Sequence, residues 1–313
     1  MATYTLSANK FIGALVNLVT YTMVNDTLNT SPLKEFNEWF KGEDIPFGTV
    51  GAITSVDIPE SQDMSETSSL TKVNKPTTTE EFVEITKYKM IPITVNKYLM
   101  RGAFFSESSL YEFIDYVLRT LPARKEIENY NECLSALESW TPTQATQTIT
   151  LSLVTPSTTA TESEKMSTYK NNARTILLAL RKVCNKFKAD TKEFNDLGYN
   201  QLVSPSSLGL FINSDYDDLL DVDTYASVFG ADYIKNGLTW GKHYAIPVSK
   251  ISTANQSKLI GILCGRRKVC YSQGYQVATS FFDGSNLNDN HWLQYSYGVS
   301  VIKGIPAVKF VTK

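Results

Sequence analysis

The two histidines of the chain, His243 and His291, are its first candidates for acid–base chemistry. His291 follows Asp289 and Asn290, and a carboxylate close to an imidazole could transfer a proton. Neighbouring side chains on a strand point to opposite faces, however, so this spacing argues against a working pair. A structural or turn role is therefore the favoured interpretation of both histidines.

A run of aspartates could offer oxygen ligands to a cation such as Ca²⁺: Asp215, Asp217, Asp218, Asp221 and Asp223. The run lacks the loop glycine and the terminal glutamate of an EF-hand. Carboxylates also stabilise the positive end of a helix dipole, which explains the run better. Motifs of serine hydrolases, zinc proteases, P-loops and dinucleotide-binding folds are absent from the sequence. We therefore expect no catalytic, cofactor-binding or metal-binding residues.

Arg266, Arg267 and Lys268 form the sharpest basic cluster of the chain. A solvated turn is the favoured interpretation of this cluster. Contact with another subunit or with phosphate is the alternative.

The composition is that of a globular protein, with 313 residues, 42% hydrophobic and 20% charged. This length predicts one large domain or two modest ones. A net charge of −2 gives no general attraction to a phosphate backbone, so dedicated nucleic-acid binding is disfavoured. No apolar run approaches the roughly 18–20 residues of a membrane span, and Met1–Lys10 lacks the pattern of a signal peptide. We expect synthesis in the cytosol and no membrane partner.

The cysteines contain no C-x-x-C pair, and a chain of this length buries a core without disulfides. We expect all four thiols to be buried small side chains: Cys133, Cys184, Cys264 and Cys270.

The N-terminal third predicts an arm and a projecting hairpin. Phe11–Val24 is apolar and uncharged, and its spacing does not decide between helix and strand. Leu33–Phe40 predicts a short amphipathic helix. Thr49–Ile58 and Phe82–Val95 predict strands, and the polar stretch Pro59–Pro76 between them cannot bury a core. A hairpin arm with a polar tip is favoured over a solvated loop.

Two longer helices are predicted from apolar residues at helical spacing. The first begins with the capping-box pair Ser109 and Glu112, is interrupted by Pro122, and continues over Ala123–Trp140. The second covers Ser167–Phe187 and carries many basic residues. Because acidic residues flank it, a solvated helix face is favoured over nucleic-acid contact.

The remaining segments predict short strands, and a short helix over Asp221–Phe229. The expected strands are Thr148–Val154, Leu208–Ile212, Tyr244–Val248, Leu259–Cys264, Lys268–Tyr271, Leu293–Val301 and Val308–Val311. Together the elements predict an α+β fold, with one long helix on an antiparallel sheet and a second α/β lobe.

Aromatic residues make up 12% of the chain. Several fall in segments that are predicted to be exposed: Tyr4, Tyr21, Trp39, Phe40, Tyr98 and Trp240. Tyr and Trp are enriched where protein surfaces meet. The pattern therefore favours an assembling protein over a catalyst.

Four stretches carry a resemblance to a known family. They are KGEDIPFGTV at Lys41–Val50, the segment from Lys97 to Leu121, INSDYDDLLDVDTYASVFG at Ile212–Gly230, and the ending NLNDNHWLQYSYGVSVIKGIPAVKFV. Their order resembles a tailed-bacteriophage major capsid protein of the Hong Kong ninety-seven fold, of the phi twenty-nine-like podovirus type. The resemblance implies an N-terminal arm (1–48), an extended hairpin loop (49–95), a peripheral domain with a spine helix (96–142 and 288–313) and an axial domain (143–287).

By the same resemblance, copies of the chain would self-assemble as pentamers and hexamers into an icosahedral or prolate shell around a viral DNA genome. The protein would then reside in the virion after synthesis in the host cytoplasm. Its partners would be itself, a separate scaffolding protein, a portal and, weakly, the packaged double-stranded DNA. Subunit contacts are expected at the hairpin tip and arm, from Tyr21, Trp39, Phe40, Asp63, Glu66, Lys72 and Lys75, with Arg266, Arg267 and Lys268 as a further contact cluster.

Three alternatives remain open. An encapsulin-like nanocompartment shell would have the same fold but enclose a cargo protein. A phage connector or tail ring protein would form a ring or tube. A cytosolic enzyme with an unrecognised site would use residues such as His291 and Asp289.

Overall fold

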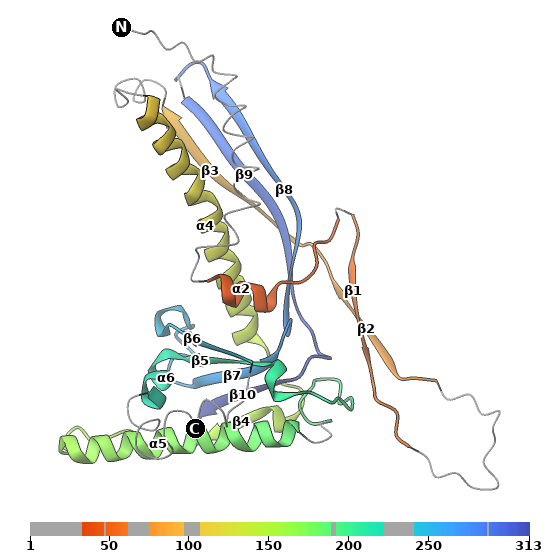
Figure 1. Ribbon diagram of the computed structural model, residues 1–313, viewed down its shortest axis with the longest axis vertical. Helices are drawn as coiled ribbons and strands as arrows, with labels where there is room; N and C mark the ends of the chain where they lie inside the picture. Colours follow the sequence, from red (N-terminus) through yellow and green to blue (C-terminus); the bar gives the residue numbers. More distant parts are fainter. Residues whose placement is uncertain are drawn as a thin grey trace. The chain divides into compact units, whose positions relative to one another are not determined.

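A computed structural model of the chain describes residues 33–46, 48–61, 75–96, 107–188, 192–221, 241–286 and 288–313. The chain forms two compact units, each assembled from several separate segments (Figure 1). Unit 1 draws its described residues from 1–51, 83–133 and 270–300. Unit 2 draws its described residues from 52–82, 134–269 and 301–313.

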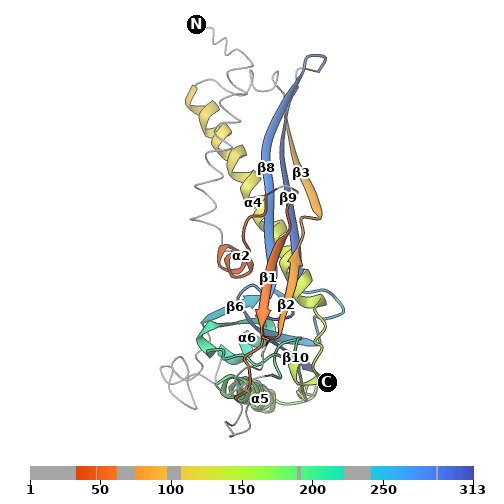
Figure 2. The same cartoon turned by 90° about the vertical axis from the view of Figure 1, so that its right-hand side faces the viewer.

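Unit 1 is built on a three-stranded sheet with the order β3-β9-β8. The strands are β3 (Lys87–Asn96), β8 (Val269–Asp283) and β9 (Asn288–Val301), and β3 pairs antiparallel with β9. The alternating pattern of β9 buries Leu293, Tyr295 and Tyr297. The hydroxyls of Tyr295 and Tyr297 donate to two glutamates of the long helix α4, which runs alongside the sheet (Figure 2). The prediction of a long helix on an antiparallel sheet is confirmed.

Helix α4 extends over Glu107–Ser139 with Pro122 inside it. The predicted interruption at Pro122 is wrong, because the helix continues through the proline. A proline removes one helix hydrogen bond and its ring crowds the carbonyl four residues earlier. Burial of Leu121 and, farther along the same helix, of Tyr130 and Leu134 stabilises the helix against this cost.

The short helix α2 (Lys34–Phe40) also belongs to unit 1. Its Phe36 ring lies 4.6 Å from the Tyr130 ring in an edge-on contact, and the Asn37 amide donates to the backbone carbonyl of Glu126 at 3.2 Å. Phe40 is 0% exposed. The expectation that Phe40 contacts another subunit is therefore wrong, because its ring packs in the core of its own subunit. Trp39 is half-buried.

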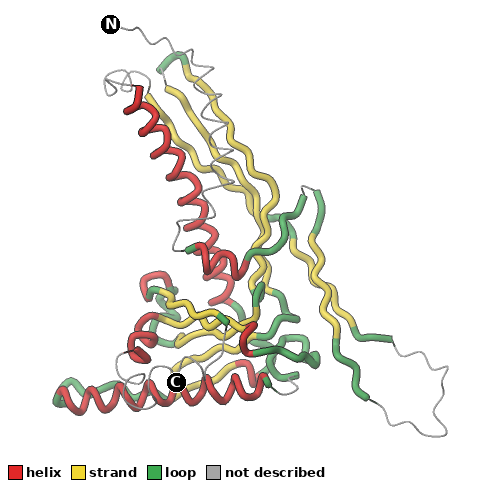
Figure 3. The backbone as a smooth tube through the Cα atoms, in the orientation of Figure 1, coloured by secondary structure: helices red, strands yellow, loops and turns green. Residues whose placement is uncertain are grey.

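Unit 2 contains a five-stranded sheet with the order β4-β10-β7-β5-β6. Its strands are yellow in Figure 3. The strands are β4 (Thr148–Leu151), β5 (Leu208–Asn213), β6 (Lys242–Ile246), β7 (Leu259–Gly265) and β10 (Ala307–Thr312). The outer pairs β10–β4 and β5–β6 are parallel, and β7 is antiparallel to both of its neighbours. Every residue of β5 and β7 is buried, as their continuous apolar runs predict.

Helix α5 (Glu162–Phe187) covers this sheet together with α6 (Ser214–Asp221). The buried side of α5 includes Ala173, Ile176, Leu180 and Phe187, which share one core with β5, β7 and β10. Three single-turn 3₁₀ helices at Ala145–Gln147, Pro205–Ser207 and Val248–Lys250 connect the strands.

Helix α5 begins earlier than predicted. The Thr161 hydroxyl accepts from the Glu164 N–H, while the Glu164 carboxylate accepts from the Thr161 N–H, so two donors at the helix start are satisfied. The predicted start at Ser167 misses this T-x-x-E signal, which lies six residues earlier, at Thr161–Glu164. The predicted helix Asp221–Phe229 lies outside the described residues after Asp221.

The units divide the chain differently from the predicted domain boundaries. Strand β8 belongs to the sheet of unit 1, although residues 143–287 were expected to form one domain. Strand β10 belongs to the sheet of unit 2, although residues 288–313 were expected to complete the other domain. The reason is backbone pairing between segments far apart in sequence, because β10 bonds to β4 and β7 while β8 bonds to β9.

Candidate subunit-contact surfaces

The predicted hairpin is a separate two-stranded sheet of β1 (Gly51–Val56) and β2 (Thr78–Val83). The second predicted strand is split, because its later part is β3 of unit 1. Exposure alternates along both strands, so one ribbon face is exposed and the other half-buried. On the exposed face, Val56 is 51% and Phe82 is 59% solvent-accessible. A two-stranded ribbon is marginally stable alone, so this ribbon needs support on at least one face.

Glu81 connects the half-buried face of the ribbon to the turn before β10 through two hydrogen bonds. Its carboxylate accepts from the backbone N–H groups of Lys303 at 2.8 Å and Gly304 at 3.0 Å. One side chain thereby satisfies two backbone donors with charge-assisted hydrogen bonds, which are the stronger kind.

A glycine at 304 is required for this contact. A Cβ atom built at Gly304 would lie 1.9 Å from the Ser55 oxygen and 2.7 Å from the Ser55 Cβ. Real Cβ atoms do not approach other atoms so closely, so any side chain at 304 would push the turn and β1 apart.

The loop 192–201 supplies further contacts to the ribbon and to the residues that extend from its strands. The Asp57 carboxylate accepts from the Asn200 N–H at 2.6 Å, and the Thr79 hydroxyl is hydrogen-bonded to the Tyr199 hydroxyl. Lys192 pairs with Glu60 at 2.6 Å. The ribbon is therefore attached along one face to the rest of unit 2, by polar groups from two separate segments.

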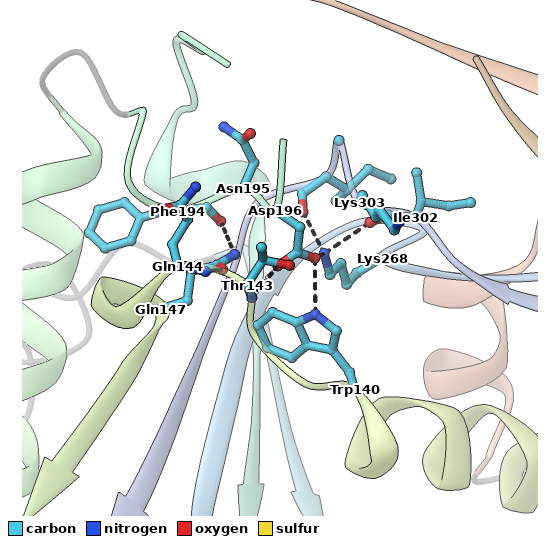
Figure 4. A network of polar contacts seen from close by, with 12 residues as sticks. Trp140, Thr143, Gln144, Gln147, Phe194, Asn195, Asp196, Lys268, Ile302 and Lys303 are labelled. Carbon is cyan, nitrogen blue, oxygen red and sulfur yellow. Dashed lines mark hydrogen bonds and ion pairs between the residues drawn. The ribbon is translucent and has the colours of Figure 1, made fainter. Parts of the chain in front are cut away.

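The two segments that hold the ribbon are joined by a buried ion pair (Figure 4). The Lys268 ammonium, 0% exposed, lies 2.7 Å from the Asp196 carboxylate and also donates to the carbonyls of Ile302 at 2.9 Å and Ile305 at 3.0 Å. The three donors of this lysine are thus all used. Asp196 belongs to the loop 192–201, and Ile302 and Ile305 belong to the turn before β10. The pair consequently fixes both supports of the ribbon.

Further donors surround the Asp196 carboxylate. It accepts from the Trp140 indole N–H at 3.0 Å and from the Thr143 N–H at 3.2 Å, and the Lys268 nitrogen lies 4.8 Å from the Trp140 ring centroid (Figure 4). Burial alone would raise the pKa of Asp196, but the Lys268 ammonium and these N–H donors outweigh burial and hold the pKa below its usual range. Burial lowers the pKa of Lys268, and the charge of Asp196 opposes that shift.

The expectation that Lys268 forms a surface contact cluster with Arg266 and Arg267 is therefore wrong. Lys268 is in the core, because its ammonium finds three acceptors there. Arg266 is exposed and Arg267 has a φ of 64°, so these two residues form a tight turn between β7 and β8. That part agrees with the favoured interpretation of a solvated turn.

The other predicted contact residues are only partly described. Lys75 is exposed just before β2, and Trp39 lies in α2. Four expected contact residues lie outside the described residues: Tyr21, Asp63, Glu66 and Lys72. Within the described part of the chain, the exposed face of the β1–β2 ribbon presents the large apolar side chains of Val56 and Phe82 to solvent.

The candidates for acid–base and metal chemistry lie in two different sheets and in α6. His291 is buried in β9, whereas His243 lies in β6 with its Nε2 atom 2.8 Å from the Asp217 carboxylate. Asp215 and Asp217 occupy the first turn of α6, as the helix-dipole explanation predicts, and Asp223 lies outside the described residues. In the described ranges, no group of three or more His, Cys, Asp and Glu side chains could hold a metal ion.

All four cysteines are buried free thiols, as expected. Burial raises the pKa of Cys184 to about 11 and that of Cys133 even further. Such thiols remain protonated at neutral pH and are poor nucleophiles.

None of the helices in the described ranges has the length and apolar character of a membrane span.

Sequence reasoning found the hairpin but missed the groups that hold it. Glu81, Asp196 and Lys268 meet partners far away along the chain, and no local spacing connects them. The available signal was weaker: Lys268 directly precedes the apolar strand residues Val269 and Cys270, where burial is expected.

Comparison with known families gives one match over nearly the whole chain. The model of the family described as Phi29-like phage major capsid protein matches residues 1–311. No curated protein sequence matches the chain.

Solved structures share the fold at low sequence identity. A chain in the structure of the head fiber and inner core protein gp22 of native bacteriophage P68 has a TM-score of 0.62 at 12% identity, covering 88% of this chain and 84% of that chain. A chain in the capsid structure of Staphylococcus phage Andhra has a TM-score of 0.61 at 11% identity, covering 91% and 87%. A chain in the virus-like particle from Pyrococcus furiosus has a TM-score of 0.52 at 10% identity, covering 96% and 99%.

Proposed function

This chain belongs to the family of Phi29-like phage major capsid proteins, and from that premise we propose which of its surfaces join the subunits of the shell. The protein is a structural protein that associates with copies of itself to form a phage capsid. The nanocompartment, connector-ring and enzyme alternatives are not favoured by this family assignment.

The proposed contact is the exposed face of the β1–β2 ribbon, defined by Ala52, Thr54, Val56, Thr78, Glu80 and Phe82. The observation that carries this proposal is the contrast between the two ribbon faces. One face is attached to its own subunit through Glu81, Asp57 and Thr79. The other presents Phe82 and Val56 to solvent. Large apolar side chains on a firmly attached ribbon suit contact with a neighbouring subunit.

The finer organisation of the shell is part of the same proposal. Subunits associate as pentamers and hexamers into an icosahedral or prolate shell. Unit 2, with the five-stranded sheet, takes the axial position near the capsomer centre, and unit 1, with α4 and its sheet, takes the peripheral position. The N-terminal arm, with Tyr21 in it, wraps a second neighbour. The hairpin tip, with Asp63, Glu66, Lys72 and Lys75, reaches over the first neighbour.

The proposed partners follow from the role of a shell. A separate scaffolding protein directs assembly and a portal occupies one vertex. The shell encloses double-stranded DNA, with which the subunits make weak contact, and the protein resides in the virion after synthesis in the host cytoplasm. The overall charge of −2 is compatible with a lining that does not trap the entering genome.

The test replaces the two apolar side chains of the exposed ribbon face, in the double variant Val56→Ser and Phe82→Ser. Burying these side chains against a neighbour contributes about 1.5–3 kcal/mol each, and the loss repeats at every contact of the closed lattice. We expect a folded subunit, with unchanged circular dichroism, whose shell yield in electron micrographs and sedimentation falls at least tenfold.

The matched control is Thr54→Ser and Thr78→Ser, which changes the same face without removing a large apolar group. It should form shells in the wild-type yield. Normal shells from the Val56/Phe82 variant would contradict the proposed role of the ribbon.

A further inference from the structure

Helix α5 concentrates positive charge in a protein whose net charge is −2. Between positions 165 and 188 the sequence contains no Asp or Glu. The same stretch contains Lys165, Lys170, Arg174, Arg181, Lys182, Lys186 and Lys188.

The core side of α5 fixes which way these charges point. Ala173, Ile176, Leu180 and Phe187 are buried against the sheet of unit 2. With about 100° of rotation per residue, these basic residues fall on the opposite, exposed half and at its borders. Lys170, Arg174, Arg181 and Lys188 form one row along one border, within an arc of about 40°, and the row is about 27 Å long at the helical rise. Lys182 lies near the middle of the exposed half, and Lys186 lies closer to its other border.

Three cations of this face, Arg174, Lys182 and Lys188, are solvent-exposed, and no ion pair within the described residues joins any of the three to an acid. Lys186 pairs with Glu193 at 3.3 Å. Glu162 pairs with Lys165 at 2.8 Å, and the Glu164 carboxylate accepts from the Thr161 N–H at the helix start.

An apolar partner does not fit this face. Between this row and Lys182 lie Asn171, Leu178 and Asn185, of which Leu178 is the one large apolar residue. A lone leucine among amides and cations cannot anchor a hydrophobic interface. A polyanion fits, because it can contact the row together with Lys182 and Lys186.

We propose that this basic face of α5, defined by Lys170, Arg174, Arg181, Lys182, Lys186 and Lys188, is the surface through which the shell contacts packaged double-stranded DNA. The inference rests on the proposed function, since it requires a shell that encloses such a genome. Duplex DNA carries one negative charge per about 1.7 Å, so a row of cations spaced 6–10 Å apart always finds phosphates within reach. Contact of this kind reads no base sequence, is weak at physiological salt and lets the duplex slide.

The first test uses the full chain and a fluorescein-labelled 30-bp duplex of arbitrary sequence. Anisotropy titrations at 25 to 200 mM NaCl compare the wild type with the triple variant Arg174→Gln, Lys182→Gln and Lys188→Gln. Glutamine keeps the helix propensity and removes one charge at each position. Each lost phosphate contact reduces the slope of log affinity against log salt concentration by roughly 0.9, so the magnitude of the slope should decrease by about 2–3. The affinity for the duplex at 50 mM NaCl should fall at least tenfold.

The matched control is Lys250→Gln, Lys258→Gln and Lys313→Gln, which removes three exposed charges from the same unit. This control should bind DNA as the wild type does. Wild-type binding by the α5 variant, or an equal loss in the control, would overturn the proposal.

Shell formation by the same three proteins separates this inference from the proposed function. Equal shell yields with a selective loss of DNA binding support the DNA-contact surface. Loss of shells in the α5 variant alone overturns it and assigns the basic face to an acidic surface of another subunit. A wild type that forms no shells contradicts the proposed function. The DNA titration still tests the basic face in that case, because it measures binding to the unassembled chain.

A second readout locates the contact inside the particle. Lysine acetylation of DNA-filled and emptied particles, followed by mass spectrometry, should show Lys170, Lys182 and Lys188 protected severalfold when DNA is present. Lys250 and Lys258 should react equally in both. Equal labelling of the α5 lysines in the two kinds of particle would overturn the assignment.

Discussion

Two ion-pair clusters, one in each unit, use the same charged groups in different surroundings. In unit 2, Lys268 and Asp196 are 0% and 3% exposed in their side chains, and each is surrounded by further hydrogen-bond partners. In unit 1, Lys87 and Lys89 pair with Glu132 between β3 and α4, with 46%, 36% and 22% of their side chains exposed.

Burial decides what each cluster does. The cluster of unit 1, called the ladder below, consists of Lys87, Lys89 and Glu132 and is partly hydrated, so removing one member leaves charges that water can solvate. Water cannot solvate the pair of unit 2 in this way, because a charge left there after its partner is removed stays buried. The first cluster therefore adjusts stability slightly, whereas the second determines whether the supports of the ribbon keep their positions.

The largest effect should follow from Lys268→Met. It leaves the Asp196 carboxylate buried without its cation, which costs about 3–5 kcal/mol of unfolding free energy. Urea unfolding of the unassembled subunit measures the loss. The double variant Lys268→Met with Asp196→Leu should recover most of it, because no buried charge remains. A single variant within about 1 kcal/mol of the wild type would contradict the comparison.

A much smaller effect is expected for Glu132→Gln in the ladder of unit 1. It removes the ion pairs to Lys87 and Lys89 but keeps a side chain that can accept from the Tyr297 hydroxyl. Partly exposed ion pairs contribute about 0.2–1 kcal/mol, and salt screens them. The difference from the wild type should shrink when urea unfolding is repeated in 0.5 M NaCl. A loss as large as that of Lys268→Met would show that exposure does not separate the clusters.

The smallest expected effect is on the pH dependence of the unfolding free energy below about pH 4.3. Burial alone would raise the pKa of Glu132, but hydrogen bonds from Lys87 and Tyr297 outweigh it and hold that pKa below its usual range. A carboxyl with a depressed pKa contributes stability that is present above its unfolded pKa of about 4.3 and is lost as pH falls through the folded value. Glu132→Gln should therefore lose less stability than the wild type below about pH 4.3. Unfolding midpoints at pH 6, 4 and 3 measure this, and parallel curves would count against the assignment.

The elements with regular patterns were predictable from sequence. The alternation of β9 and the continuous apolar runs of β5 and β7 indicate their burial directly, because side-chain period and solvent contact are local properties. The fold class followed from those elements and from the family resemblance, and both are confirmed.

The partition of strands between units was not predictable in the same way. Strands β8 and β10 are each apolar enough for either sheet, and only backbone pairing with distant strands decides their membership. The same holds for Lys268, which looks like part of a surface cluster beside Arg266 and Arg267 because its acceptors are contributed by residues 196, 302 and 305. Local sequence does not encode which distant carbonyls will converge on an ammonium.

The close approach of Gly304 to Ser55 has an evolutionary consequence. A side chain at 304 would overlap both the oxygen and the Cβ of Ser55, so trimming Ser55 to alanine would relieve the overlap only partly. Among relatives that keep this ribbon attachment, the two positions should covary: a larger residue at the position of Gly304 should occur with glycine at the position of Ser55. Lineages with glycine at neither position should have rebuilt the turn, and their ribbons should leave the subunit at a different angle.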